Sequence, residues 1–451
     1  MNYKSSTYNL FVDIAPRTTV VFNSASGAIV KLDNHLVSQL SNSEFIFFDN
    51  YPGFEELKKQ GLIVPENKDE FNTLLFDREV YTFDQSPQLM GFVVAPTMGC
   101  NLNCPYCFEA GVRKNRPMTI ETWDRVYGFI INRVKEHPSI KEVDISWFGG
   151  EPCLQIDPIL TFSRKIIETL RERGIGYQAR IVTNGTLLNE SVALKLKEAS
   201  VKKAQITIDG LAENYAKRKG CTEDVFKNVI DNITTASKYL HVNVRLNLDR
   251  ENIDDTESLL RYLLDEKKLN GVINVTPAPI RPWNDSDNRY YLTGEEYLRF
   301  ITKLHDIILE NNWEGSFAPK RPARRLGPCG SVRNTNCTIG PDGRLYRCEH
   351  CLGRYELSIG DVSNGENYND VNMRFMMCSY SDRCKTCKGF PVCVGGCIAS
   401  QLLHHIEPEY CNHYEDLLKE NVRFAYLSKK KKSNNVSAYE AQLTPWGFDY
   451  K

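Results

Sequence analysis

Two hydrophobic patterns alternate along the chain from residue 91 to about residue 280. Short apolar runs typical of buried strands are separated by longer segments in which apolar residues recur every three or four positions, as on one face of a helix. The strand runs read GFVVAPT, VDISWFGG, ARIVTNG, AQITIDG, VNVRLNL and GVINVTPAP. Repeated strand–helix units predict parallel strands with right-handed crossovers, here an α/β fold with a partial, TIM-like (β/α)6 barrel. In such a barrel the chemistry lies at the carboxyl ends of the strands.

The regions on either side of this repeat differ from it. In residues 1–88 the runs NLFVDI, TTVVFN and GAIVKLD predict three strands, and HLVSQL and GFEELKKQ predict helices. These elements form a small α+β domain of winged-helix type. The barrel domain spans residues 89–315, and its last helix opens with a capping-box spacing from Thr293 to Glu296.

Residues 316–428 are rich in cysteine and loops up to about Cys411, and a helix follows in NHYEDLLKENVRFAYL. A segment with so few core-forming residues needs bound metal to order it. The lysine run KKKK begins a part, residues 429–451, that is predicted to be a flexible, solvated tail.

Composition narrows the possible functions. The 451 residues carry 56 basic and 57 acidic side chains, so bulk charge gives no support for a nucleic-acid or membrane partner. No long apolar segment or targeting signal is present, which predicts a soluble, cytoplasmic protein. Ten of the 15 cysteines lie between Cys329 and Cys411, and in a reducing compartment such crowding indicates metal binding rather than disulfides.

The motif Cys100-x3-Cys104-x2-Cys107 directly follows the first strand of the repeat. Three thiolates can hold three irons of a [4Fe-4S] cluster and leave the fourth iron open to another ligand. The stretch CNLNCPYCF, with Tyr106 before its third cysteine, resembles the signature of the radical S-adenosylmethionine (SAM) enzymes. The resemblance implies that SAM binds the open iron and is cleaved to methionine and a 5'-deoxyadenosyl radical, which removes a hydrogen atom from the substrate.

The resemblance also implies a SAM site along the strand ends. The element Phe148-Gly-Gly-Glu-Pro152 matches a family motif in which glycine allows close backbone approach to the methionine ammonium. The candidate SAM-binding residues are Tyr106, Gly149, Gly150, Glu151, Pro152, Thr183, Asn184, Thr207, Arg218 and Arg245. No catalytic base is assigned from the sequence. Asp209 is a candidate for this role, with an ordinary turn residue as the alternative.

The spacing Cys384-x2-Cys387-x5-Cys393-x3-Cys397 resembles the SPASM extension of radical SAM enzymes, which carries two auxiliary [4Fe-4S] clusters and brings the total to three. By this resemblance Cys329, Cys337, Cys348 and Cys397 hold the first auxiliary cluster, and Cys384, Cys387, Cys393 and Cys411 hold the second. Cys337 stands closer to Gly343 than is usual, and Cys351 is a further candidate ligand. The ligands of the first auxiliary cluster are therefore left open. One alternative is that only three cysteines bind it, which leaves one iron for a substrate thiolate.

A zinc ribbon is the competing interpretation of this segment. It pairs Cys348 and Cys351 with Cys384 and Cys387, as in a zinc-binding or regulatory protein, and leaves the other cysteines of the motif without a role. Cys153, Cys221 and Cys378 fit no motif and are expected to be buried or surface residues.

The first domain contains no catalytic constellation. Its pattern, including FEELKKQGLIVP, resembles the leader-peptide recognition element of enzymes that modify ribosomally made peptides. A structural or DNA-binding winged helix is the alternative. Together the modules predict a radical SAM peptide maturase that forms thioether crosslinks of the ranthipeptide or sactipeptide type. Its expected partners are a leader-containing precursor peptide and an electron donor such as flavodoxin or ferredoxin. A carbon-carbon crosslinking enzyme and a formylglycine-forming sulfatase maturase are alternatives.

Overall fold

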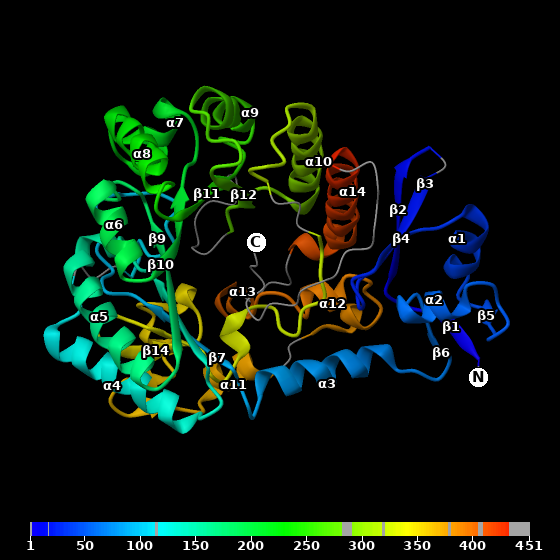
Figure 1. Ribbon diagram of the computed structural model, residues 1–451, viewed down its shortest axis with the longest axis horizontal. Coiled ribbons are helices and arrows are strands. Elements are labelled where there is room, and N and C mark those ends of the chain that lie inside the picture. The colour runs from blue at the N-terminus through cyan, green and yellow to red at the C-terminus, as the bar shows by residue number, and fades with distance from the viewer. Residues whose placement is uncertain are drawn as a thin grey trace.

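The computed structural model describes residues 2–16, 18–112, 116–281, 291–317, 321–377, 380–404 and 409–432. A ten-stranded mixed sheet forms its centre, in the order β12-β11-β10-β9-β8-β7-β13-β14-β15-β16 (Figure 1). Six of its strands come first in the chain: β7 (Leu89–Val94), β8 (Glu142–Trp147), β9 (Gly176–Thr183), β10 (Val201–Thr207), β11 (His241–Leu248) and β12 (Asn274–Pro279). These six strands are parallel and lie in sequence order, as the six apolar runs predict.

Helices follow the strands and pack on one side of this sheet (Figure 1). They are α4 (Ile120–Glu136), α5 (Ile156–Glu172), α6 (Glu190–Glu198), α7 (Ala212–Lys219), α8 (Glu223–Ala236), α9 (Thr256–Leu260), which continues as a π-helix over Arg261–Glu266, and α10 (Gly294–Glu310). The capping box of α10 is present, with Thr293 and Glu296 as its two side chains. The hydrophobic pattern missed only α7, whose sequence AENYAKRK contains few apolar residues.

The two faces of the parallel sheet differ in polarity. In β11 the buried residues Val242, Val244 and Leu246 alternate with the half-buried Arg245 and Asn247. Successive side chains of a strand point to opposite faces, so the apolar set packs against the helices and the polar set lines the other face. The sequence motifs lie at the carboxyl ends of these same strands.

The sheet also continues beyond β7 into the cysteine-rich segment, which the sequence pattern did not predict. The added strands are β13 (Cys337–Ile339), β14 (Arg344–Tyr346), β15 (Gly360–Asp361) and β16 (Gly365–Glu366). Cys337 pairs with Phe92 and Ile339 with Val94, so β13 covers the edge of β7. Runs of two or three residues are too short for a hydrophobic period to be recognised.

Arg347 ties these added strands together. Its buried guanidinium donates to the carbonyl oxygens of Arg333 (2.9 Å) and Asn336 (2.8 Å), to Asn372 Oδ1 (2.6 Å) and to Glu366 Oε2 (2.7 Å). This one side chain thus links the segment that precedes Cys337 to the segment that follows Cys348.

We expect Arg347→Met to lower the free energy of unfolding by about 3–5 kcal/mol, because Glu366 loses the closer of its two arginine partners among the described residues and keeps only Arg133, at 3.5 Å. Arg344→Met, on the neighbouring strand with a 45% exposed side chain, is the matched control and should change it by less than about 0.5 kcal/mol. Urea unfolding of the anaerobic proteins measures both. Equal effects of the two substitutions would contradict the role assigned to Arg347.

The N-terminal domain contains two small sheets rather than one. The first has the order β5-β1-β6 and the second β2-β3-β4. The elements are β1 (Tyr3–Ser5), β2 (Asn9–Ala15), β3 (Thr18–Asn23), β4 (Ile29–Lys31), α1 (Asn34–Ser41), β5 (Ile46–Phe47), α2 (Phe54–Lys59), β6 (Ile63–Pro65) and α3 (Glu70–Thr82). The predicted strands and helices are all present, and β1, β5, β6 and α3 are additional.

The second of these sheets packs against the C-terminal helix α14 (Tyr414–Lys432). Val12 and Val20 share a buried cluster with Leu418 and Val422. Residues 429–432 are part of this helix rather than of a flexible tail, and the remainder of the predicted tail lies outside the described residues. Among the described residues no helix has the length and apolarity required to span a membrane.

Candidate functional site

Cys100, Cys104 and Cys107 lie on the loop between β7 and α4, at the carboxyl end of the sheet, and all three are partly exposed. Soft thiolates of this kind suit iron–sulfur clusters. Within the described ranges, no three Cys, His, Asp or Glu side chains gather as ligands of a single metal ion. A four-iron cluster needs a different arrangement, because each cysteine thiolate binds a separate iron. The cysteine sulfur atoms are therefore spread around the cluster and do not converge on one point. The donor set on this loop therefore fits the cluster.

The two glycines after β8 bring that strand end into contact with the cysteine loop. The backbone N–H of Gly150 donates to Thr97 O (3.1 Å), and that of Glu151 donates to Gly99 O (2.8 Å). A Cβ atom at Gly149 or Gly150 would lie 2.2 Å from a carbonyl oxygen of this loop, and Gly149 has φ +109°. The motif thus requires glycine for packing against the loop that carries the cysteines.

Glu151 is completely buried, and its carboxylate accepts three hydrogen bonds. Its Oε1 accepts from the Thr183 hydroxyl (2.7 Å) and from Cys153 N–H (2.9 Å), while Oε2 accepts from Asn184 N–H (2.7 Å). Burial raises the pKa of the Glu151 carboxyl, and these hydrogen bonds oppose that shift. Pro152 is buried at the start of the short 3-10 helix that follows. Glu151 therefore holds the ends of β8 and β9 together.

Asn184 extends this connection to the cysteine loop. Its Nδ2 donates to Asn101 Oδ1 (2.7 Å) and lies 3.7 Å from Cys100 Sγ. Asn101 in turn donates to the Thr186 hydroxyl (2.8 Å). The structure thus brings the second and third strand ends to the first cysteine, as the motif order predicts.

Three further candidates for SAM contact are Thr207 on β10, Arg245 on β11 and Arg218 near the end of α7, which follows β10. Thr207 ends β10 and is the register partner of Arg245 in β11. Arg245 donates from Nε to Asn247 Oδ1 (2.8 Å). The buried guanidinium of Arg218, a candidate SAM-binding residue, donates to both carboxylate oxygens of Asp249 (3.1 and 2.7 Å). Its charge is therefore balanced within the protein.

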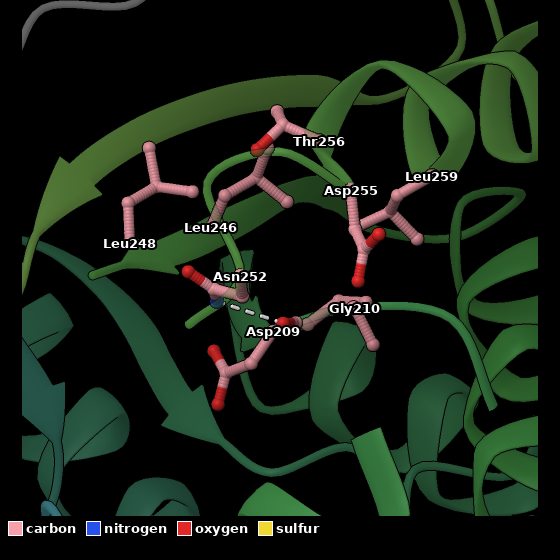
Figure 2. Close-up of a pocket in the computed structure, with 9 residues that line it drawn as sticks. Asp209, Gly210, Leu246, Leu248, Asn252, Asp255, Thr256 and Leu259 are labelled. Carbon is pink, nitrogen blue, oxygen red and sulfur yellow. Dashed lines mark hydrogen bonds between the residues drawn. The ribbon is translucent and has the colours of Figure 1, made fainter. Parts of the chain in front are cut away.

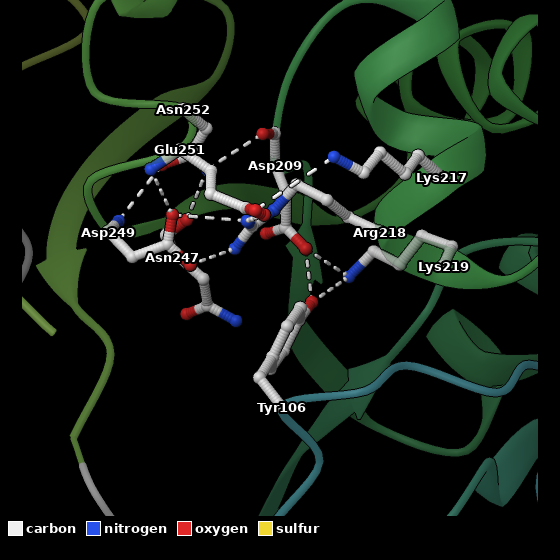
Figure 3. Close-up of polar contacts among 9 residues, drawn as sticks. All are labelled: Tyr106, Asp209, Lys217, Arg218, Lys219, Asn247, Asp249, Glu251 and Asn252. Carbon is white, nitrogen blue, oxygen red and sulfur yellow. Dashed lines mark hydrogen bonds and ion pairs between the residues drawn. The ribbon is translucent and has the colours of Figure 1, made fainter. Parts of the chain in front are cut away.

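Tyr106, Asp209 and Lys219 form a buried polar cluster beside the second cysteine (Figure 3). The Lys219 ammonium donates to the Tyr106 hydroxyl (2.6 Å) and pairs with Asp209 Oδ2 (2.9 Å), which also accepts from the Tyr106 hydroxyl. Asp209 was a guess for the catalytic base, and these contacts instead place it in a structural ion pair. Its other oxygen, Oδ1, is buried and has no hydrogen-bond partner among the described residues.

A small pocket lies behind the Asp209 loop, where Asn252 donates to the Asp209 carbonyl oxygen (2.8 Å, Figure 2). Its other walls are mostly apolar, and it has no space for a water-sized molecule. A larger cavity, of about 490 Å³, lies between α11 (Asp370–Met376) and α13 (Ile398–His404) and is lined by Met373, Met377 and Leu402 among others.

The four cysteines expected at the second auxiliary cluster are brought together. Burial, followed by the thiolates of Cys411, Cys387 and Cys384, raises the pKa of the Cys393 thiol to about 12. Cys393 ends the short helix α12 (Phe390–Cys393), and Cys384 and Cys387 pack beside Tyr8 of the N-terminal domain. That domain therefore packs directly against this group.

The four cysteines expected at the first auxiliary cluster are not all brought together. Cys348 and Cys397 lie in one apolar cluster with Cys351. Burial raises the pKa of the Cys348 thiol, followed by the charge of Glu349 and then by those of Cys351, Cys329 and Cys397. Cys337 lies elsewhere, in the main core on β13, and its raised pKa reflects burial and the nearby Glu366. The structure thus places Cys351, rather than Cys337, beside the other three.

This group of cysteines lies next to the loop of Cys100, Cys104 and Cys107. The Phe108 ring lies 4.4 Å from the His350 ring and 6.2 Å from Phe148, measured between centroids. Arg354 donates to the carbonyl oxygens of His350 (3.0 Å) and Phe108 (3.5 Å). The two cysteine-bearing segments therefore share one interface.

The zinc ribbon finds no support in this arrangement. Cys348 and Cys351 belong to the apolar cluster around Met98, whereas Cys384 and Cys387 pack in another around Tyr8 and Phe390. Of the cysteines that fit no motif, Cys153 is buried, Cys221 is half-buried, and Cys378 lies outside the described residues.

Sequence reasoning missed Lys219, Asp249, Asn101 and Asn252, which tie the strand ends together. In the sequence, the only indication that Arg218 and Lys219 belong to the site was their position at the end of a polar segment after β10. Their partners become evident only when β10 and β11 are adjacent.

The comparisons with known proteins agree with this geometry. Residues 94–263 match the Radical SAM superfamily. The cysteine-type anaerobic sulfatase-maturating enzyme of Clostridium perfringens is 26% identical over 379 residues, which cover 78% of this chain and 100% of that enzyme. The probable GTP 3',8-cyclase of Pyrococcus abyssi is 31% identical over 295 residues, which cover 60% of this chain and 88% of that protein.

Among solved structures, Streptococcus suis SuiB bound to the precursor peptide SuiA aligns with a TM-score of 0.54. The alignment has 15% sequence identity and covers 91% of this chain and 99% of SuiB. At 15% sequence identity, this structural match supports the fold alone. Together with the cysteine loop and the parallel sheet, the sequence matches show that the chain belongs to the radical SAM superfamily.

Proposed function

We propose that this radical SAM enzyme is a maturase that installs thioether crosslinks in a ribosomally synthesised peptide. Two features support the proposal. The cysteine loop and two further groups of cysteines lie in one molecule, and an N-terminal domain without its own catalytic residues packs against one of these groups. The relatives include enzymes that act on peptides or proteins, since one is a sulfatase-maturating enzyme and another is bound to a precursor peptide.

In this proposal Cys100, Cys104 and Cys107 hold the cluster that binds SAM, and Cys384, Cys387, Cys393 and Cys411 hold the second auxiliary cluster. The first auxiliary cluster takes Cys329, Cys348 and Cys397, with Cys351 in place of Cys337. When bound, SAM and these clusters supply hydrogen-atom abstraction and an acceptor for one electron. Glu151, Asn184 and the two glycines keep the strand ends in register around that site.

The precursor peptide is proposed to bind at strand β4. In the sheet β2-β3-β4, β2 contacts α14, whereas β4 is an edge strand with no further partner among the described residues. Ile29 and Val30 of β4 are half-buried and Lys31 is exposed. An extended leader can add to such an edge through backbone hydrogen bonds, while side-chain pockets give specificity. An electron donor such as flavodoxin or ferredoxin would complete the system.

Formylglycine formation is the second candidate, because the C. perfringens sulfatase-maturating enzyme aligns over its whole length. The two reactions leave different products. A thioether crosslink retains the cysteine sulfur and removes two hydrogen atoms, whereas oxidation of cysteine to formylglycine removes the sulfur and leaves an aldehyde.

The test is incubation of the reconstituted enzyme with SAM, a reductant and a cysteine-containing leader-plus-core peptide encoded beside its gene. We expect a product lighter by two hydrogen atoms per crosslink, with blocked thiols and no reaction with hydrazide. An aldehyde that reacts with hydrazide would favour formylglycine formation. An unchanged peptide alongside rapid SAM cleavage would contradict both.

A further inference from the structure

Lys219 contacts the cysteine loop on both sides of Cys104. Its carbonyl oxygen accepts a hydrogen bond from Asn103 N–H (3.1 Å), and its ammonium donates to the hydroxyl of Tyr106 (2.6 Å). The next residue, Gly220, has φ +62°, and a Cβ atom there would lie 3.0 Å from Asn103 O. The end of α7 is therefore packed closely against the loop residue that precedes Cys104.

The Lys219 side chain is itself held in place. It is 3% exposed and pairs with Asp209, which is completely buried, at 2.9 Å. Arg218, the preceding residue, pairs with Asp249 at the end of β11 (Figure 3). The lysine is thus anchored through α7 to two neighbouring strand ends.

We propose that Lys219 is a positioning residue that holds the Asn103–Tyr106 part of the cysteine loop so that Cys104 can bind its iron. This inference rests on the proposed role of Cys100, Cys104 and Cys107 as cluster ligands. Lys219 acts through its contacts with Asn103 and Tyr106. A flexible loop would lose conformational entropy when it binds the cluster. The contacts with Lys219 hold this loop in place before the cluster binds, so that cost is smaller.

Two variants separate the hydroxyl contact from the buried charge. Tyr106→Phe keeps the ring and the Lys219–Asp209 pair but removes the hydroxyl that links them to the loop. The double variant Lys219→Met/Asp209→Asn removes both charges together, because loss of the lysine alone would leave a buried carboxylate without its partner and destabilise the fold. Lys217→Met is the matched control on the same helix, since its side chain is 72% exposed and contacts Glu251.

The experiment follows the release of iron to a chelator from the reconstituted, full-length proteins. The phase that is missing from the Cys100→Ala/Cys104→Ala/Cys107→Ala protein identifies the SAM-binding cluster. We expect Tyr106→Phe and the double variant to accelerate this phase about tenfold, the ratio expected from loss of one buried hydrogen bond, and to leave the auxiliary phases unchanged. The control should match the wild type. The change that SAM causes in the electron paramagnetic resonance (EPR) spectrum should also weaken in the two variants.

Each other outcome has a definite meaning. Wild-type release and wild-type spectra in both variants would overturn the inference, and so would equal acceleration of every phase, which indicates general destabilisation. If the wild type lacked any phase that depends on the three cysteines, the proposed function would fail before the role of Lys219 was tested.

Discussion

Replacing Cys100, Cys104 and Cys107 together by alanine is expected to reduce 5'-deoxyadenosine formation to the level of a reaction without enzyme. These three thiols lie on the loop that Gly150, Glu151 and Asn184 contact from the neighbouring strand ends. Without their thiolates the loop offers no ligands for iron, and SAM has no metal to bind. The measurement is chromatographic detection of 5'-deoxyadenosine in anaerobic reactions with excess reductant.

The same variant should keep the auxiliary clusters. We expect iron to fall from about twelve to about eight atoms per chain, because only one of three four-iron clusters is lost. Replacement of the buried Cys153 by alanine is the control, since this thiol lies nearby but contacts Thr183 rather than the loop. It should retain all of the iron. Undiminished 5'-deoxyadenosine formation by the triple variant would refute the ligand assignment.

The second prediction with a large effect distinguishes Cys351 from Cys337. Cys351→Ala is expected to lose the first auxiliary cluster, about four iron atoms per chain, because Cys351 packs with Cys348 and Cys397. Cys337→Ala should retain every iron atom and cost about 1 kcal/mol of stability, because it removes one buried sulfur from the core around β13. Iron analysis and urea unfolding of the two proteins measure these effects.

This pair tests the structure against the resemblance, which assigned Cys337 to the first auxiliary cluster. Loss of iron in Cys337→Ala, with full iron in Cys351→Ala, would restore the original assignment. Full iron in both variants would indicate that Cys329, Cys348 and Cys397 suffice. One iron of that cluster would then be open to a substrate thiolate.

Local sequence patterns predicted the parallel sheet and the position of the cysteine loop. Buried strands such as β11 show an alternating pattern over eight residues, and amphipathic helices such as α5 extend over 17 residues, so each element carries its own signal. The second auxiliary group is also local, since three of its cysteines lie within ten positions. For these features the sequence alone is sufficient.

Features that depend on tertiary contacts were not predictable in this way. The strand β13 has three residues, and its pairing with β7 joins segments more than 240 positions apart, so the sequence did not reveal that Cys337 lies in the main core. The pairing of Arg218 with Asp249, which directly follows β11, was likewise not predictable from the sequence. Charge partners across a sheet have no local signature in the sequence.

The most direct test of the central claim is the EPR spectrum of the reduced, oxygen-free protein recorded with and without SAM. The cysteine loop provides three thiolates for four irons, so SAM should bind the remaining iron and change the signal of that one cluster, while the auxiliary signals stay as they were. Identical spectra in the presence and absence of SAM, from protein with its full iron content, would contradict the account.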